Sequence, residues 1–281
     1  MKNPVPRTSI AELSARYDAL LFDAYGVLVH AEGALPGAAK LIDELNRGNK
    51  PYCLVTNDAS TLPESAAERY RRFGLSLDAD RIVSSGGLLD GFFEQQGLRG
   101  ARCAVLGPRD SARFVERAGG EVVGASEAFE VLVVGDETGF PFLETVDAAL
   151  SSLFRRIDRG EQVHLVLPNP DLIFPAGENG FGFAAGSLAL MFEAALARRY
   201  PQRGDLRFSR LGKPEPHLYR QAMRVLGTNN AVMIGDQLET DIAGAHAAEI
   251  DSVLIATGVS STDLAAIDPA QRPTHWMPSL L

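Results

Sequence analysis

The stretch "YDALLFDAYGVLVH", residues 17–30, indicates the fold class and raises the question of function. Its apolar run "ALLF" (19–22) is followed at once by an acid, Asp23, and then by Tyr25 and Gly26. A short strand without a polar position is typical of the interior of a parallel sheet, where helices cover both faces. We therefore expect Asp23 to stand at the carboxyl end of a buried strand.

Helical and strand patterns alternate in the segments that follow. "PGAAKLIDELNRG" (36–48) carries apolar residues on one helical face between a proline and a glycine, and "LPESAAERYRRFG" (62–74) repeats this arrangement. "YCLVTN" (52–57) and "RIVSS" (81–85) are strand-like runs. This β–α–β–α–β order predicts the α/β class, with a doubly wound, Rossmann-like parallel sheet and right-handed crossovers.

The same pattern returns near the end of the chain. "RFSRLG" (207–212), which we read as a strand, precedes the helical "KPEPHLYRQAMRVLG" (213–227). The strand "AVMIGD" (231–236) then leads into the helical "LETDIAGAHAAE" (238–249) and the strand "DSVLIATG" (251–258). These segments continue the sheet that the first strands begin.

A separate α/β pattern lies between these halves. Its strand-like runs are "RCAVLG" (102–107), "VLVVGDE" (131–137) and "VHLVLPN" (163–169). A middle segment with its own strands is best explained as an inserted domain. The expected division is a first part of the core at 1–86, an inserted α/β cap domain at 87–205 and a second part of the core at 206–281.

Composition narrows the classes of partner and compartment. The 281 residues include 27 Lys and Arg against 36 Asp and Glu, a net charge of −9, with no basic cluster that would attract nucleic acid or an anionic membrane. Cys53 and Cys103 sit in apolar runs, as buried thiols do in a reducing compartment. The first residues lack the apolar core of a signal peptide, and the apolar tract 182–192 is shorter than the ~20 residues of a spanning helix. We expect a cytoplasmic protein.

Polar residues follow four strand-like runs. Asp23 ends the first run, Thr56 and Asn57 end the second, and Lys213 follows "RFSRLG". Asp236 ends the fourth, with Asp241 about a turn into the next helix. Because ligands of an open parallel sheet bind beyond the carboxyl ends of its strands, these side chains are expected to share one site.

This set of groups suits phosphoryl transfer. A carboxylate such as Asp23 can attack phosphorus and form an aspartyl-phosphate, which divides one difficult displacement into two. Mg²⁺ would neutralise the phosphoryl oxygens, held by Asp23, Asp236 and the main-chain carbonyl of Tyr25. Thr56 and Asn57 would bind the remaining phosphoryl oxygens, and the ammonium of Lys213 would restrain the nucleophile.

The motifs resemble those of the haloacid dehalogenase-like (HAD) hydrolase superfamily. "FDAYGVL" (22–28), "LVTNDAS" (54–60), "LGKPEP" (211–216) and "IGDQLETDIAGA" (234–245) are similar to its four motifs, in order. The chain looks most like subfamily IIA, the NagD-like and 4-nitrophenyl- or pyridoxal-phosphatase-like enzymes, whose C2-type cap is inserted between the second and third motifs. "PNPD" (168–171) resembles the return segment of that cap.

The resemblance implies a role for each matching residue. Asp23 is the expected nucleophile, Thr56 a catalytic and phosphate-binding residue, and Lys213 the group that steadies the charge. Asp236 is the expected Mg²⁺ ligand with Asp241 as a further ligand or a partner of one. The other candidates for binding the phosphorylated substrate are Asn57, Asp58 and Asn169.

Tyr25 departs from the family pattern, because the phosphatases carry a second aspartate at this position. That aspartate protonates the leaving oxygen and then activates water, a contribution of roughly 10²–10⁴-fold. A phenol, with a reference pKa near 10, is a poor base at neutral pH. We therefore expect a weakened general acid/base step, with His30 and Asp58 as the nearest substitutes in sequence.

Two alternatives stay open beside a Mg²⁺-dependent phosphatase of a small phosphorylated metabolite. "DAYG" (23–26) also looks like the first motif of the 2-haloacid dehalogenases, in which halide leaves without protonation. Such an enzyme needs no Mg²⁺, whereas the acidic fourth motif with Asp236 and Asp241 is retained here. The other alternative is a binding protein for a phosphate ligand with little or no turnover. Caps of this type can pair, so a homodimer is compatible with the sequence.

Overall fold

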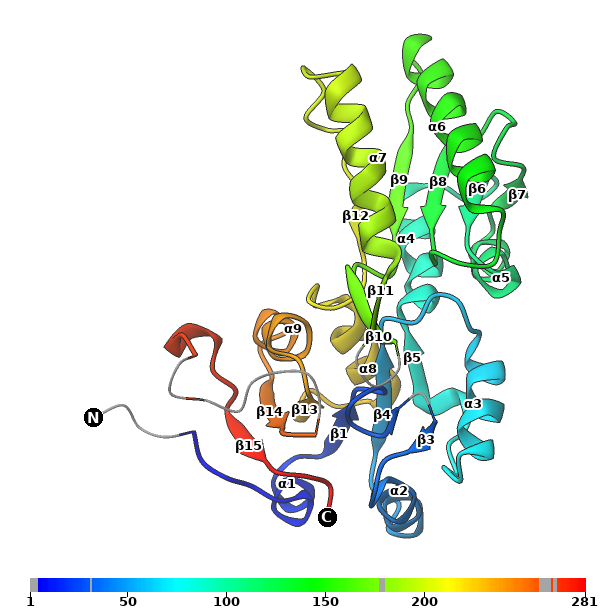
Figure 1. Ribbon diagram of the computed structural model, residues 1–281. Coiled ribbons are helices and arrows are strands. Elements are labelled where there is room, and N and C mark those ends of the chain that lie inside the picture. Colours follow the sequence, from blue (N-terminus) through cyan, green and yellow to red (C-terminus); the bar gives the residue numbers. More distant parts are fainter. Residues whose placement is uncertain (1–4, 31, 177–179, 258–263, 265–266) are drawn as a thin grey trace. The chain divides into compact units, whose positions relative to one another are not determined.

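The computed structural model describes residues 5–30, 32–176, 180–257, 264 and 267–281 (Figure 1). The chain folds into two compact units. Unit 1 comprises 1–56, 63–83 and 213–281, and unit 2 comprises 57–62 and 84–212. The assignment of these units as core and cap stays a prediction.

A six-stranded sheet forms the centre of unit 1, in the order β15-β14-β13-β1-β4-β5. The central strand β1 (Ala19–Phe22) pairs in parallel with β13 (Ala231–Gly235) on one side and β4 (Tyr52–Thr56) on the other. The remaining strands are β14 (Asp251–Ile255), β15 (His275–Met277) and β5 (Ile82–Ser84). All four residues of β1 are buried, as its uninterrupted apolar run predicts.

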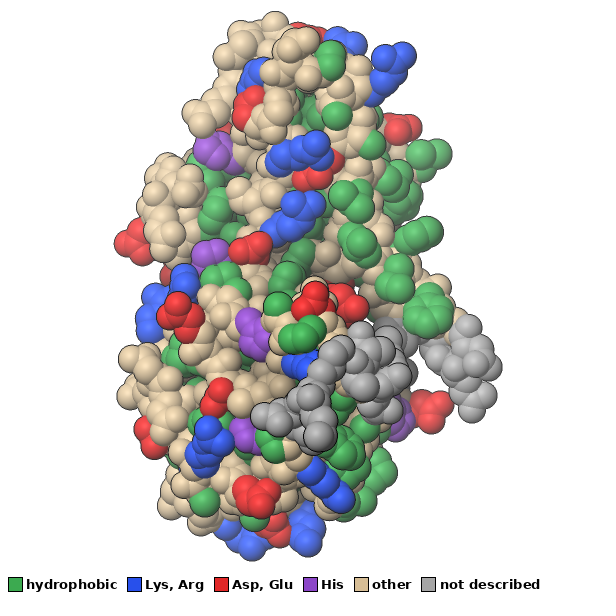
Figure 2. All heavy atoms as spheres, turned by 90° about the vertical axis from the view of Figure 1, so that its left-hand side faces the viewer, with side chains coloured by type: hydrophobic (Ala, Val, Ile, Leu, Met, Phe, Trp, Pro, Cys, Tyr) green, Lys and Arg blue, Asp and Glu red, His purple; other side chains and the backbone are tan. Residues whose placement is uncertain are grey.

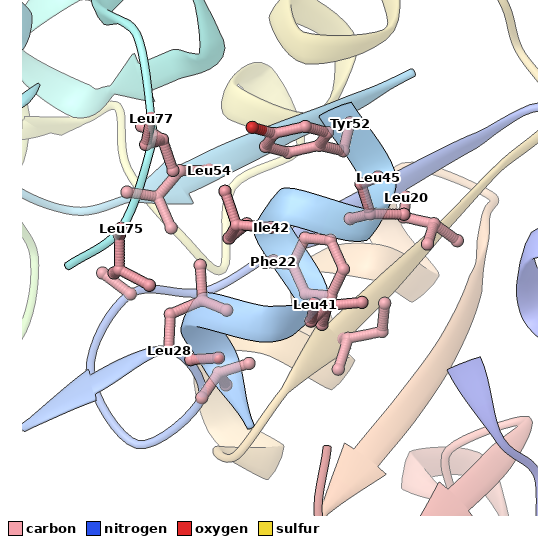
Figure 3. Packing of buried hydrophobic residues seen from close by; sticks show 14 of the residues in the cluster. Leu20, Phe22, Leu28, Leu41, Ile42, Leu45, Tyr52, Leu54, Leu75 and Leu77 are labelled. Atoms are coloured by element: carbon pink, nitrogen blue, oxygen red, sulfur yellow. The ribbon is translucent and has the colours of Figure 1, made fainter. Parts of the chain in front are cut away.

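Helices cover both faces of this sheet. One face packs against α1 (Ile10–Arg16), α2 (Ala38–Arg47) and α3 (Pro63–Arg72). Figure 3 shows Leu41, Ile42 and Leu45 of α2 lying against Leu20 and Phe22 of β1. Each such fully buried side chain contributes roughly 1.5–3 kcal/mol relative to exposure. On the sheet's other side, α8 (His217–Leu226) contacts β1 and β4, and α9 (Ala243–Ala247) contacts β14.

Short elements complete unit 1. A small hairpin follows β1, with β2 (Val29–His30) antiparallel to β3 (Gly33–Ala34). A single π-helical turn, Leu238–Ile242, precedes α9. Two 3₁₀ segments, Ala79–Arg81 and Pro269–Gln271, also belong to unit 1.

Unit 2 has its own five-stranded sheet, in the order β12-β9-β8-β6-β7. The strands are β6 (Arg102–Leu106), β7 (Glu121–Val123), β8 (Val131–Val134), β9 (His164–Leu167) and β12 (Ser209–Arg210). Its helices are α4 (Leu89–Gln96), α5 (Arg109–Arg117), α6 (Phe142–Asp158) and α7 (Ala185–Arg199), with a 3₁₀ turn at Ser85–Leu88. The strands β10 (Ile173–Ala176) and β11 (Gly180–Phe183) form a separate antiparallel pair.

These two helix-flanked parallel sheets confirm the expected α/β, doubly wound fold, with one departure. The expectation that "RFSRLG" continues the first sheet is wrong, because β12 pairs in parallel with β9 of unit 2. Lys213 therefore follows a strand of the second sheet. Two residues of extended backbone carry too weak a pattern to indicate which sheet they join.

The burial of the two cysteines and the mixture of charges on the surface agree with what the composition predicts. Cys53 and Cys103 are buried free thiols, and burial raises the pKa of each to about 12. On the face seen in Figure 2, acidic and basic side chains are interspersed. Within the described part of the chain, no helix has both the length and the apolarity needed to cross a membrane.

A hydrogen bond of the buried Tyr17 joins the end of α1 to the start of β14 in unit 1. The Tyr17 hydroxyl donates to Asp251 at 2.6 Å, and the Thr274 hydroxyl donates to the same carboxylate at 3.1 Å. Tyr17→Phe is expected to lower the free energy of unfolding by about 1.5–3 kcal/mol, because the acceptor is charged. Tyr52→Phe, which loses a bond to the neutral Asn46 amide at 2.9 Å, should cost about 0.5–1.5 kcal/mol. Urea denaturation of both variants measures the difference, and equal losses would contradict this assignment.

Candidate active site

Strand register brings two aspartates to one edge of the unit 1 sheet. Phe22 of β1 lies beside Ile234 of β13, and the Asp23 amide donates to the Ile234 carbonyl at 3.0 Å. The chain then leaves β1 at Asp23 and leaves β13 just before Asp236. Because the strands are parallel, both carboxylates emerge at the edge where open α/β sheets bind ligands.

Three carboxylates form a buried cluster at this edge. One oxygen each from Asp23, Asp236 and Asp241 lies within 4.8 Å of the other two. Their residues are only 6%, 1% and 0% exposed. A concentration of negative charge in a dry site is unfavourable without compensating cations. Hard carboxylate oxygens are the donors that Mg²⁺ prefers, so the residues present fit a magnesium ion.

Lys213 supplies one compensating cation. Its ammonium donates to Asp23 Oδ1 at 2.6 Å and to Asp241 Oδ1 at 2.7 Å, and the residue is 3% exposed. A buried ion pair of this kind is held by its geometry, and removing one partner alone typically costs 3–5 kcal/mol. The lysine thereby joins three segments that are distant in sequence.

The pKa values of Asp23 and Lys213 reflect the balance between burial and the neighbouring charges in this cluster. Burial raises the pKa of Asp23 to about 8; the ammonium of Lys213 opposes this rise, and the carboxylates of Asp241 and Asp236 add to it. Burial alone would lower the pKa of Lys213, but Asp23 and Asp241 hold it well above its ordinary value. One ammonium therefore does not neutralise the cluster, and further positive charge would favour the ionised form of Asp23.

Asp241 also holds the loop that carries Asp236. Its Oδ2 accepts hydrogen bonds from the amides of Asp236 at 3.1 Å and Gln237 at 3.2 Å, while its Oδ1 accepts from Lys213. The sequence predicts an ordinary helical turn here, whereas the structure has a π-helical turn, Leu238–Ile242. Such turns are rare and recur at functional sites.

The turn after Asp23 approaches Asp236 closely. Gly26 has φ +79°, and a Cβ at this position would lie 2.4 Å from Asp236 Oδ2. The Gly26 amide donates to the Val29 carbonyl at 2.9 Å, which closes the turn. Only glycine satisfies both the left-handed backbone and the close approach. Tyr25, just before it, has a side chain on the surface, 48% exposed.

The predicted residues of the second motif divide between the two units. Thr56 ends β4 of unit 1 and is 9% exposed, whereas Asn57 groups with unit 2 and is 5% exposed. Asn57 Nδ2 donates to Asp171 Oδ1 at 2.9 Å. Asp58 Oδ1 accepts hydrogen bonds from the amides of Ser60 and Thr61 at 2.8 and 2.9 Å, which is a turn-capping arrangement.

Two further predicted residues take part in local turns. Asn169 Oδ1 accepts from the Asp171 amide at 3.0 Å in unit 2. The exposed His30 accepts from the Glu32 amide at 3.0 Å through Nδ1. Within unit 1 the structure thus brings together Asp23, Lys213, Asp236 and Asp241. Sequence reasoning missed the contact of Asp171 with Asn57, because no spacing links residues 114 positions apart.

The raised pKa of Asp23 makes a prediction about stability. The folded pKa is about 8 and the unfolded value is near 3.9, so the folded state binds an extra proton between these values. The stability from this group is complete below pH ~4 and is lost as pH rises to about 8. Asp23→Asn removes this titration, so in EDTA the variant should lose at least about 1 kcal/mol less stability than the wild type between pH 4 and pH 8, whatever its stability at pH 4.

Urea denaturation from pH 4 to 8 measures this effect. Asp43→Asn removes an exposed carboxylate of α2 in the same unit and is the control, expected to follow the wild-type curve. Curves of stability against pH that run parallel for the wild type and Asp23→Asn would refute the assignment.

Comparisons with known proteins agree with this geometry. The sequence model of the haloacid dehalogenase-like hydrolases matches residues 20–121, and the HAD-hydrolase-like model matches residues 210–281. A dihydroxyacetone phosphatase of Corynebacterium glutamicum is 27% identical over 263 residues, covering 92% of this chain and 88% of the relative.

Two solved structures extend the likeness to three dimensions. A possible sugar phosphatase of the HAD superfamily from Cytophaga hutchinsonii has a TM-score of 0.83 and 29% identity, covering 99% of each chain. A glycerol phosphate phosphatase from Mycobacterium tuberculosis, in complex with magnesium, has a TM-score of 0.80 and 25% identity, covering 95% of this chain and 77% of that one. The fold, the order of the motifs and these matches agree, and the chain belongs to the haloacid dehalogenase-like hydrolases as an enzyme of that family.

Proposed function

We propose that this enzyme is a Mg²⁺-dependent phosphatase that hydrolyses a small phosphorylated metabolite through an aspartyl-phosphate on Asp23. The observation that carries the proposal is the contact of the Lys213 ammonium with the Asp23 carboxylate at 2.6 Å, in a cluster with two further carboxylates. A nucleophile restrained by a cation, beside oxygen ligands for a metal, is the arrangement that phosphoryl transfer requires.

The metal would be held by Asp23, Asp236 and the main-chain carbonyl of Tyr25, with Asp241 as a further ligand or a partner of one. When bound, it would supply positive charge against the phosphoryl oxygens. The complex of one relative with magnesium supports this choice of metal. The hydrogen bonds of Asp241 give it the additional task of fixing Lys213 and the Asp236 loop.

The reaction would proceed in two displacements at phosphorus, first by Asp23 and then by water, and side chains of this protein are available for both. An oxygen of Asp23 forms a bond to phosphorus while the bond from phosphorus to the leaving oxygen breaks. Water then attacks the aspartyl-phosphate, releases inorganic phosphate and restores the carboxylate. Lys213 stabilises the charge throughout, and Thr56 and Asn57 would bind the other phosphoryl oxygens. Asp58 and Asn169 are weaker candidates for this task, because each has an oxygen engaged in a local turn.

The substrate class rests on the relatives. Among them are a dihydroxyacetone phosphatase, an acid sugar phosphatase and a glycerol phosphate phosphatase, names that indicate small phosphorylated substrates. A small phosphorylated metabolite is therefore the proposed substrate.

Turnover of p-nitrophenyl phosphate tests the reaction. We expect release of phosphate that needs Mg²⁺ and disappears in EDTA. Asp23→Asn should abolish turnover, because an amide is not a nucleophile of comparable strength. Tight binding of phosphate esters without release would contradict turnover, and release of halide from 2-chloropropionate in EDTA would favour the dehalogenase alternative.

The proposal includes a weakened acid/base step at Tyr25. Tyr25 occupies the sequence position at which the family's phosphatases carry the carboxylic acid that protonates the leaving oxygen, and the residue is 48% exposed. Esters whose leaving group departs without a proton, such as aryl or acyl phosphates, should therefore react faster than alkyl phosphates. His30 and Asp58 are poorly suited to replace the acid, because both accept hydrogen bonds within their own loops.

Tyr25→Asp tests this step. The variant should raise kcat/KM for an alkyl ester such as glycerol phosphate by about tenfold or more, with a smaller gain for p-nitrophenyl phosphate. Tyr25→Asn is the matched control, since it has the same size without an acid and should give no gain. Equal activity of the Asp and Asn variants on the alkyl ester would show that another group protonates the leaving oxygen.

Pairing of two copies also stays a prediction. The described parts of unit 2 at 172–174 and 180–191 expose a concentration of large apolar side chains, which is typical of an interaction surface. These are Leu172, Ile173, Phe174, Phe181, Phe183, Leu190 and Met191.

A further inference from the structure

We propose that Asp171 is a positioning residue for phosphate binding, acting through Asn57. The inference rests on the proposed function, in which Asn57 belongs to the phosphate-binding segment. It assigns a purpose to an acidic side chain in contact with that segment, where a carboxylate would otherwise repel a phosphate.

Asn57 is held at both its side chain and its main chain within unit 2. Its Nδ2 donates to Asp171 Oδ1 at 2.9 Å, and its carbonyl accepts from the Ser85 hydroxyl at 2.7 Å. The residue is 5% exposed. A hydrogen bond to an ionised acceptor is roughly twice as strong as a neutral one, so the orientation of the amide depends strongly on Asp171.

The oxygen of the Asn57 side-chain amide, Oδ1, lies close to the backbone of Gly212. A Cβ on Gly212 would lie 2.5 Å from Asn57 Oδ1, so only glycine at this position leaves room for the Asn57 side chain. The Gly212 amide in turn donates to the Pro168 carbonyl at 2.9 Å. Segment 168–171 thus holds both Asn57 and Gly212, which in sequence directly adjoin Thr56 and Lys213.

Asp171 is itself fixed by its surroundings. Its amide donates to Asn169 Oδ1 at 3.0 Å, and its carbonyl accepts from the Gly186 amide in the first turn of α7 at 2.9 Å. A carboxylate on a braced turn can hold the Asn57 amide without reorganisation. A phosphate would then meet a backbone already in place, which is the basis of preorganised electrostatic stabilisation.

Binding of inorganic phosphate in the presence of Mg²⁺, followed by calorimetry, tests the proposal without requiring turnover. Asp171→Ala should weaken phosphate binding by about tenfold and raise KM for p-nitrophenyl phosphate more than it lowers kcat. Asp171→Asn keeps an acceptor oxygen and should stay within about threefold of the wild type. Asp136→Ala is the control, since it removes a carboxylate that caps another turn of unit 2, bonded to the Thr138 amide at 2.9 Å. It should leave phosphate affinity unchanged.

An exchange of the two side chains gives a sharper test. Asn57→Asp places two carboxylates against each other and should weaken phosphate binding more than Asp171→Ala does. The double variant N57D/D171N restores a hydrogen bond between the same positions with donor and acceptor reversed. It should bind phosphate at least about fivefold more tightly than N57D alone, a coupling of the size found between residues in direct contact.

Three results would overturn the proposal: wild-type phosphate affinity in Asp171→Ala, equal damage in Asp171→Asn and Asp171→Ala, or no recovery in the double variant. Thermal unfolding of each variant separates loss of affinity from loss of folding. If the wild type binds phosphate but does not turn over p-nitrophenyl phosphate, the proposed function fails while the comparison of phosphate affinities still decides the role of Asp171.

Discussion

A lysine ammonium bound to two buried carboxylates is the interaction on which the site of this enzyme depends. Lys213 contacts Asp23 and Asp241, and Asp241 in turn holds the amide of Asp236. The segments involved come from the first strand, the return from unit 2 and the turn before α9. Loss of the lysine would leave uncompensated charge in a dry interior, so the geometry of all three segments relies on it.

The same interaction leaves the cluster with an excess of negative charge. Three carboxylates face one ammonium, and burial, with a smaller contribution from the carboxylates of Asp241 and Asp236, raises the pKa of Asp23 to about 8. A protein selected for stability alone would not retain such a cluster. The free-energy cost of this cluster is explained if a divalent cation neutralises the carboxylates, and the phosphoryl group that binds with it, during function. The site is thus organised around charge that the substrate and metal bring with them.

Much of the fold follows from the sequence, because strong local patterns specify it. The run at 19–22 gives β1 within its bounds, and the glycines and prolines around 36–48 and 62–74 delimit α2 and α3 closely. Asp23 and Asp236 could be assigned to one sheet edge because parallel strands end on the same side. Their meeting with Lys213 and Asp241 also follows the order of the motifs.

Other features depend on contacts that local patterns do not encode. β12 is two residues long, and its pairing with β9 is decided by the packing of unit 2. The π-helical turn at Leu238–Ile242 has the residue types of an ordinary helical turn, and it contains Asp241, whose side chain accepts a hydrogen bond from the Gln237 amide. The hydrogen bond between Asn57 and Asp171 joins two turns, and neither turn has a sequence feature that indicates the other as its partner.

The position of β1 in the sheet has a consequence for synthesis on the ribosome. This strand emerges early, yet one of its two neighbours, β13, is translated some two hundred residues later. Unit 2 is nearly continuous in sequence and can fold while β1 still lacks that neighbour. An entirely apolar strand with an unsatisfied edge is prone to association with other nascent chains. Slow translation of the last third of the chain would therefore lower the yield of native enzyme, whereas chaperones that shield the first segment would raise it.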